Sequence, residues 1–145
     1  MEEVKTKALK RESVSETVTI TGLKPTPFEE LDDEARIAIH CASEKKAENI
    51  VALDLREITS FAEFFVIASG RNQRQVQAIA DEINLKLKKQ HKTKAIRIEG
   101  YDSAEWVLLD YGDFIFHIFN ETSREFYDLE RLWRDARRVQ LPEDL

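Results

Sequence analysis

The sequence predicts a single α/β domain in which a mixed five-stranded sheet is flanked by helices, in the order α-β-β-α-β-β-β-α. Short apolar runs separated by turn residues indicate strands, and apolar stripes with a period near 3.6 residues indicate helices. The chain has 145 residues, which is the length of one domain. No repeat or second zone of composition divides it, so the elements should share one core.

The first predicted helix begins near Asp33, where Asp32 and Asp33 can accept hydrogen bonds from the free amides of the first turn. Small and apolar residues then recur at helical spacing, at Ala35, Ala38, Ile39 and Ala42. Two strands follow, at 49–55 and 63–69. Both are apolar at successive positions, as expected of central strands that are covered on two faces.

The second predicted helix carries the clearest signals in the chain. Gly70 ends the preceding strand, and Asn72 can cap the helix with Gln75 three positions later, which is a variant of the capping box. One apolar stripe then continues at helical period, formed by Val76, Ile79, Ala80, Ile83 and Leu87.

Three further strands are predicted at 95–100, 106–110 and 114–120. The turn between the last two contains Tyr111 and Gly112, and glycine supplies the positive φ that a tight turn needs.

A closing helix is predicted from the T-x-x-E capping box of Thr122 and Glu125 to about Arg138. One face of this helix is apolar, formed by Phe126, Leu129, Leu132, Trp133 and Ala136. The predicted domain therefore spans 31–138, with a flexible N-terminal tail at 1–30 and a C-terminal tail at 139–145. The first tail mixes five Lys/Arg with six Asp/Glu and shows little periodic hydrophobicity.

Composition excludes several classes of function. Hydrophobic residues make up 42% and charged residues 34%, which is typical of a globular protein. No apolar run approaches the roughly 20 residues that a bilayer span needs, so no membrane partner is expected. The net charge of -6 opposes non-specific nucleic-acid binding and favours a protein partner. Because Cys41 is the one cysteine, a disulfide within the chain is excluded and a reducing, cytoplasmic location is expected.

The predicted hairpin at 106–120 is the strongest feature, because both faces of both strands carry large apolar side chains. Either the helices cover all of it, or some aromatic area near the strand ends stays exposed. An exposed apolar patch would mark a docking site for a partner, with aromatic residues as its anchors. The residues leave these two readings open.

Three aspartates and one loop permit an enzymatic hypothesis. Asp54, Asp110 and Asp113 lie at predicted strand ends, where carboxylates can hold magnesium for phosphoryl or nucleotidyl transfer. Ser69 and Gly70 open the helix at 72, whose free amides could hold a phosphate. The alternative is that the aspartates bond to turn amides and that the loop is a plain strand-to-helix turn, and the residues favour it.

Two further features have a plain structural interpretation. His117 lies inside an apolar strand and is expected to be a hydrogen-bonded interior residue, because no histidine or serine at a catalytic or metal-binding spacing accompanies it. A basic segment can complement the dipole at a helix C-terminus or contact RNA backbone, and its lysines are Lys86, Lys88, Lys89, Lys92 and Lys94.

Several separate segments resemble one known family, the ribosomal silencing factors, also called Iojap-like proteins. They agree in order and spacing: LDL, SGRN-x-x-Q, EG, W-V-x-x-D-x-G-D and FYDLERLW, between about Leu31 and Ala136. The resemblance implies a fold similar to nucleotidyltransferases, without enzymatic activity and without a cofactor.

The resemblance also implies a function. Family members bind the large ribosomal subunit through its protein fourteen and sterically block joining of the small subunit, which lowers translation when nutrients are short. Carried over by position, the docking surface comprises Trp106, Asp110, Tyr111, Gly112, Asp113 and Phe119. The competing hypotheses are a magnesium-dependent nucleotidyltransferase and a homodimer formed through the apolar hairpin.

Overall fold

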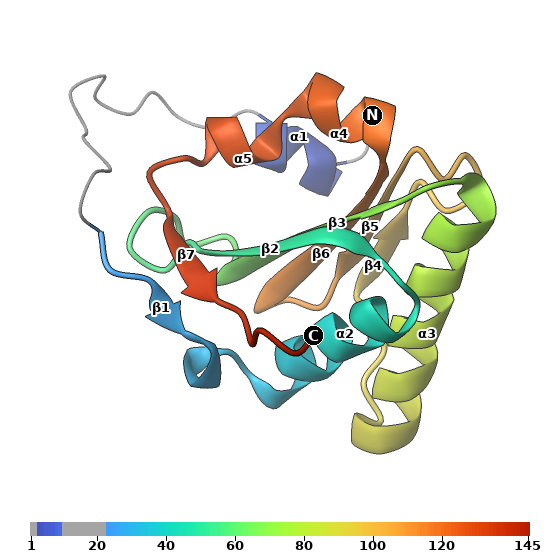
Figure 1. Ribbon diagram of the computed structural model, residues 1–145, viewed down its shortest axis with the longest axis horizontal. Coiled ribbons are helices and arrows are strands. Elements are labelled where there is room, and N and C mark those ends of the chain that lie inside the picture. Colours follow the sequence, from blue (N-terminus) through green and yellow to red (C-terminus); the bar gives the residue numbers. More distant parts are fainter. Residues whose placement is uncertain (1–2, 10–22) are drawn as a thin grey trace.

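The computed structural model describes residues 3–9 and 23–145. Within them, seven strands form one mixed sheet in the order β1-β7-β2-β3-β6-β5-β4 (Figure 1). The strands are β1 (Thr26–Pro27), β2 (Glu48–Asp54), β3 (Phe64–Gly70), β4 (Arg97–Glu99), β5 (Trp106–Asp110), β6 (Phe114–Asn120) and β7 (Arg137–Gln140). The α/β class and the five predicted strands are confirmed. The prediction of a five-stranded sheet is wrong, because β1 and β7 extend it at one side.

Helices cover both faces of the sheet (Figure 1). One face packs against α2 (Asp33–Glu44) and α3 (Gln73–His91). The opposite face packs against α1 (Glu3–Leu9), α4 (Glu121–Tyr127) and α5 (Leu129–Leu132). Each face has its own apolar cluster, so the sheet is covered on two sides, as the continuously apolar strands indicate.

The helix α3 forms as its sequence predicts. The side chain of Asn72 accepts a hydrogen bond from the amide of Gln75 at 2.8 Å, and the Gln75 side chain accepts one from the amide of Arg71 at 2.7 Å. All five residues of its predicted stripe are fully buried. The helix α2 begins at Asp33 as predicted, although the Asp32 side chain makes no capping bond.

The prediction of one closing helix to Arg138 is wrong. Asn120, and not Thr122, caps α4, because its side chain accepts a hydrogen bond from the Ser123 amide at 2.8 Å. Asp128 then adopts a left-handed φ of 48°, which separates α4 from the single turn of α5. Arg137 and Arg138 pair instead with β2, where the strand gains hydrogen bonds along an otherwise open edge. Phe126 is 78% exposed, so it does not belong to the predicted apolar face.

The ends of the described chain contact the predicted domain. The helix α1, the strand β1 and a short 3-10 helix at Phe28–Glu30 lie within the segment predicted as a tail. Residues 10–22 of that segment lie outside the described residues. At the other end, Val139 is buried in β7, and Leu141 and Leu145 pack against the core.

In the part of the chain that the structure describes, none of the helices has the length and apolar character that spanning a bilayer requires.

Candidate functional site

The helices of the chain cover both faces of the hairpin formed by β5 and β6. The two strands are antiparallel, with Trp106 opposite Phe119 and Asp110 opposite Ile115. Val107, for example, belongs to the cluster under α2 and α3, whereas Trp106 and Phe119 belong to the cluster under α1, α4 and α5. Most of the hairpin is therefore core.

Trp106 is 4% exposed and Phe119 is 0% exposed, so the expectation that these two side chains offer open aromatic area is wrong. The Trp106 ring stacks on Phe119, with centroids 5.0 Å apart, and touches the ring of Tyr127 on α4 at 4.7 Å. Lys5 of α1 lies over the same ring, with Nζ 4.8 Å from its centroid. The expectation failed because α1 and α4 jointly close this face.

His117 is a buried, hydrogen-bonded residue, as its apolar strand predicts. Its Nδ1 accepts a hydrogen bond from Nε1 of Trp106 at 3.0 Å, which places the proton of the neutral ring on Nε2. Burial, together with the smaller effect of the charge of Lys5, lowers the pKa of His117 to about 3. The imidazole is therefore neutral at physiological pH and acts as part of the core.

The turn between β5 and β6 is partly accessible. Gly112 has a φ of 90°, as predicted, and its amide donates a 2.8 Å hydrogen bond to the Asp110 carboxylate. Tyr111 is half-buried: its ring stacks on Phe114 at 5.1 Å and its hydroxyl is hydrogen-bonded to Asn84. Burial raises the pKa of Tyr111, so its hydroxyl stays protonated. Asp113 is exposed.

An apolar surface missed by the sequence analysis lies beside this turn. Ile96 is 71% exposed and Ile98 is 48% exposed, on and just before the edge strand β4. The amide of Ile96 donates to the carbonyl of Asp110 at 2.7 Å, and a Cβ at Gly112 would lie 3.2 Å from Cδ1 of Ile96. We call Ile96, Ile98 and the turn at 110–113 the edge surface. The isoleucines two positions apart in a short strand were the available signal, but the sequence does not show that this strand is an edge.

The aspartates of the magnesium hypothesis do not form one site. Asp54 is buried, and its carboxylate accepts hydrogen bonds from Thr26 at 2.7 Å and from Nη2 of Arg56 at 2.8 Å. Although burial alone would raise it, these bonds hold the pKa of Asp54 below its usual value. Asp110 uses its carboxylate within the turn, so its role matches the plain structural reading.

The predicted phosphate loop is also structural. The hydroxyl of Ser69 is buried and accepts a hydrogen bond from Nη1 of Arg124 at 2.8 Å. A Cβ at Gly70 would lie 2.8 Å from Cγ2 of Val76, so glycine is needed where β3 meets the first turn of α3. These contacts leave neither residue directed at an anion.

Within the described ranges, a different set of acids comes together, formed by the exposed side chains of Asp32, Glu63 and Asp113. Their carboxylate oxygens lie within 4.8 Å of one another. Burial, followed by the charge of Asp113, raises the pKa of both Asp32 and Glu63. This acidic group makes the surface beside the turn negative.

A family model described as "Ribosomal silencing factor during starvation" matches residues 28–145. The chain belongs to this family. Ribosomal silencing factor RsfS of Halalkalibacterium halodurans is 42% identical over 106 residues, which cover 73% of this chain and 90% of that protein. The protein Iojap, chloroplastic, of Zea mays is 33% identical over 135 residues, which cover 89% of this chain and 58% of that protein.

Solved structures show the same fold as this silencing-factor chain. A Chromobacterium violaceum protein has a TM-score of 0.68 at 33% identity, with 77% of this chain and 88% of that chain covered. A Bacillus halodurans protein has a TM-score of 0.65 at 39% identity, with 74% of this chain and 96% of that chain covered. The family is a regulatory one. The likeness to nucleotidyltransferases stays a prediction.

The basic segment of this family member lies at the C-terminal end of α3. Lys88 and Lys89 are in its last turn and are exposed, so they complement the helix dipole. Lys92 ends the helix with a left-handed φ of 53°, and Lys86 pairs with Glu82 at 3.9 Å. These positions are compatible with the structural account and leave the exposed lysines available to a partner.

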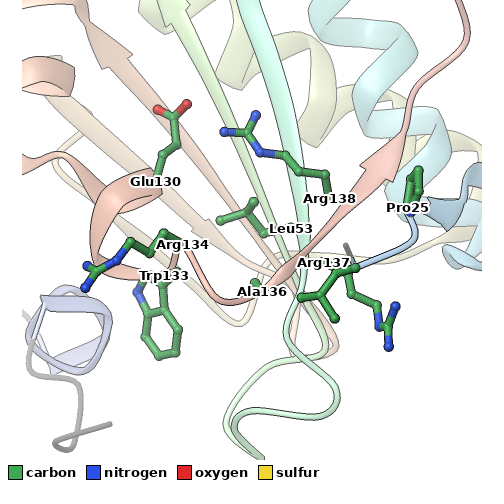
Figure 2. Close-up of a pocket in the computed structure, with 9 residues that line it drawn as sticks. Pro25, Leu53, Glu130, Trp133, Arg134, Ala136, Arg137 and Arg138 are labelled. Carbon is green, nitrogen blue, oxygen red and sulfur yellow. The ribbon is translucent and has the colours of Figure 1, made fainter. Parts of the chain in front are cut away.

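A pocket of about 190 Å³ lies where β7 meets α5. Three arginines line it, but Figure 2 shows that the guanidinium groups of Arg134, Arg137 and Arg138 point in different directions. Arg137 is already paired with Glu57 at 3.7 Å and donates to the carbonyl of Lys24 at 3.2 Å. The cations therefore do not converge on one anion.

Proposed function

We propose that this chain is a ribosomal silencing factor that binds the large ribosomal subunit through its protein fourteen. Bound there, it would sterically block association with the small subunit and so repress translation under nutrient limitation. Family membership over 28–145 is the observation that supports the proposal. No chemical step is required, because exclusion depends on affinity and concentration alone.

The edge surface is the docking site that the geometry favours. Its centre is apolar, formed by Ile96 and Ile98, and Asp110 and Asp113 lie at its margin. An apolar centre with an acidic rim suits a partner that is apolar in the middle and basic around it, as ribosomal proteins often are.

The other predicted docking residues take different roles in this proposal. Tyr111 and Gly112 set the shape of the turn through the Asn84 bond and the positive φ. Phe119 supports Trp106 from within the core and makes no contact with the partner itself. The exposed lysines at the end of α3 contact the ribosomal RNA backbone as a minor, salt-dependent addition.

The test is co-sedimentation with purified large subunits, with small subunits added in competition. We expect Ile96→Asp to reduce binding at least tenfold, because a buried unpaired carboxylate at an interface costs more than about 1.4 kcal/mol. Ile96 is exposed in the free chain, so the substitution should leave the fold intact.

The matched control is Leu23→Asp, which places the same charge on an exposed leucine beside β1, at the opposite side of the sheet. It should co-sediment like the parent. If Ile96→Asp binds as well as Leu23→Asp, the edge surface is not the docking site. If the parent chain does not bind large subunits or inhibit subunit joining, the function itself is wrong.

A homodimer through the edge surface would compete with docking, because both would use β4. Light scattering across chain concentrations measures this directly. A dimer that Ile96→Asp dissociates, and that added large subunits also dissociate, would place both partners on one surface.

A further inference from the structure

The short helix α1 occupies an aromatic surface formed by both tryptophans of the chain. Nζ of Lys5 lies 4.8 Å from the centroid of the Trp106 ring and donates a 2.7 Å hydrogen bond to the carbonyl of the same residue. About one turn later, the carbonyl of Ala8 accepts a hydrogen bond from Nε1 of Trp133 at 2.9 Å. Val4 and Ala8 are buried in the same cluster. Figure 2 shows the Trp133 indole directed toward the pale blue turn of α1.

These contacts are specific, and the short helix depends on them for its order. The helix has seven residues, and isolated helices shorter than about 12 residues are marginal in water, so its order depends on the surface beneath it. It buries a valine and an alanine, which are small side chains. A helix held in this way can detach while the domain stays folded.

The helix is also an addition to the family domain. The family match begins at residue 28, whereas α1 ends at Leu9. Both tryptophans, by contrast, lie within the matched residues. The aromatic surface therefore belongs to the shared domain. Tyr127 of α4, which covers part of it, also lies within the match, whereas α1 lies outside it.

We propose that α1 is an autoinhibitory lid, which competes with a cationic partner surface for Trp106. The proposal rests on the proposed function, in which that partner is the large ribosomal subunit. The indole face attracts a cation, which Lys5 supplies in the closed chain and which a basic ribosomal surface would supply in the complex. Trp106 begins β5, and its side chain faces α1. Ile98, which lies opposite Leu109, faces the other side of the sheet, so an open lid offers the partner a second contact that is separate from the isoleucines.

The first test needs no ribosome, because the two tryptophans are the chain's whole indole fluorescence. A glutamate cannot be accommodated at the fully buried Ala8, so Ala8→Glu should release α1. We expect red-shifted emission and stronger acrylamide quenching, with the cooperative unfolding of the parent retained. The control is Lys7→Arg, on the exposed side of α1, which keeps the positive charge in the last turn and should keep the parent's emission.

The second test measures the affinity of the full-length variants for purified large subunits. A lid closed about nine-tenths of the time lowers apparent affinity roughly tenfold, so Ala8→Glu should bind about tenfold more tightly than the parent and Lys7→Arg. Lys5→Ala, which removes the cation but adds no charge, should give a smaller gain in the same direction. Lys5→Ala also replaces Ala8→Glu as the test variant if Ala8→Glu no longer unfolds cooperatively.

The outcomes separate the two proposals. Unchanged fluorescence in both Ala8→Glu and Lys5→Ala would show that α1 does not cover the tryptophans in solution, and would overturn the lid. If the opened variants expose their tryptophans but bind large subunits with the parent's affinity, α1 covers the tryptophans without inhibiting binding. That result would overturn the lid and leave the proposed function standing. If the parent and the opened variants all fail to bind large subunits, the proposed function fails and the lid fails with it.

Discussion

The bond between Trp106 and His117 illustrates what single residues decide in this chain. It joins the first position of β5 to the middle of β6, and it fixes which nitrogen of the imidazole carries the proton. The sequence predicts an interior, hydrogen-bonded histidine because its strand neighbours are apolar. It could not identify Trp106 as the donor, because that contact depends on the strand register. Alanine at Trp106 would remove a ring that packs on Phe119 and Tyr127, so it would disturb the core as well as any docking.

The low pKa of His117, about 3 in the folded chain, makes stability depend on pH. Below pH 6.5 His117 becomes protonated in the unfolded chain but stays neutral in the folded chain. The free energy of unfolding is therefore highest above pH 6.5 and decreases progressively toward pH 3. The loss is about 1.4 kcal/mol per pH unit, or about 2 kcal/mol by pH 5. Urea unfolding at pH 7.5 and pH 5.0 measures it.

His117→Gln provides the comparison, because it cannot titrate and can still accept from Trp106. The variant should start less stable, but its loss between the two pH values should be about 2 kcal/mol smaller than the parent's. Equal losses in parent and variant would mean that other groups cause the pH dependence.

Among the elements, α3 and the C-terminal segment show why some predictions succeed and others fail. The capping residues and apolar stripe of α3 lie within its own sequence, so its local signal suffices. The closing segment carries an equally clear helical stripe, yet a left-handed Asp128 interrupts it and β2 captures its last residues as β7. Pairing with a strand that is distant in the sequence outweighs the local helical periodicity there, and no local sequence pattern indicates this pairing.

The left-handed φ of 48° at Asp128 gives a direct test of this break. Valine is strained in that region, so Asp128→Val should lower the free energy of unfolding by about 1–2 kcal/mol. Glycine adopts the same φ without strain, so Asp128→Gly should be at least as stable as the parent. Urea unfolding checks both variants, and equal destabilisation by the two would argue against a φ effect.

At the scale of the whole molecule, sequence patterns predict the fold class, the mixed sheet and the tight turn at Tyr111 and Gly112. They do not predict which aromatic faces are closed. That depends on α1. Its apolar residues, Val4, Ala8 and Leu9, form a weak helical pattern, and only the structure shows that they pack beside Trp106 and Trp133. The edge surface was missed for a related reason, because exposure of Ile96 and Ile98 follows from strand order.

The C-terminal residues predicted as a tail supply a test at this scale. Val139 is buried in β7, and Leu141 and Leu145 pack on the core. Ending the chain after Arg138 should therefore cost at least about 2 kcal/mol of unfolding free energy, since burying one such side chain contributes about 1.5–3 kcal/mol. Glu143→Ala, at an exposed position, is the control, and thermal unfolding of both is the measurement. A truncated chain as stable as the control would show that the segment is dispensable.

The pairing of β1 with β7 has a consequence for how the chain is made. Thr26 and Val139 are neighbours in the sheet, yet Val139 belongs to β7, which is synthesised after the other six strands of the described sheet. A domain begins to fold from its N-terminal part while synthesis continues. The outer edge of β2 therefore stays unpaired until residues 137–140 have left the ribosome, so this side of the sheet closes only after every other described strand has been synthesised.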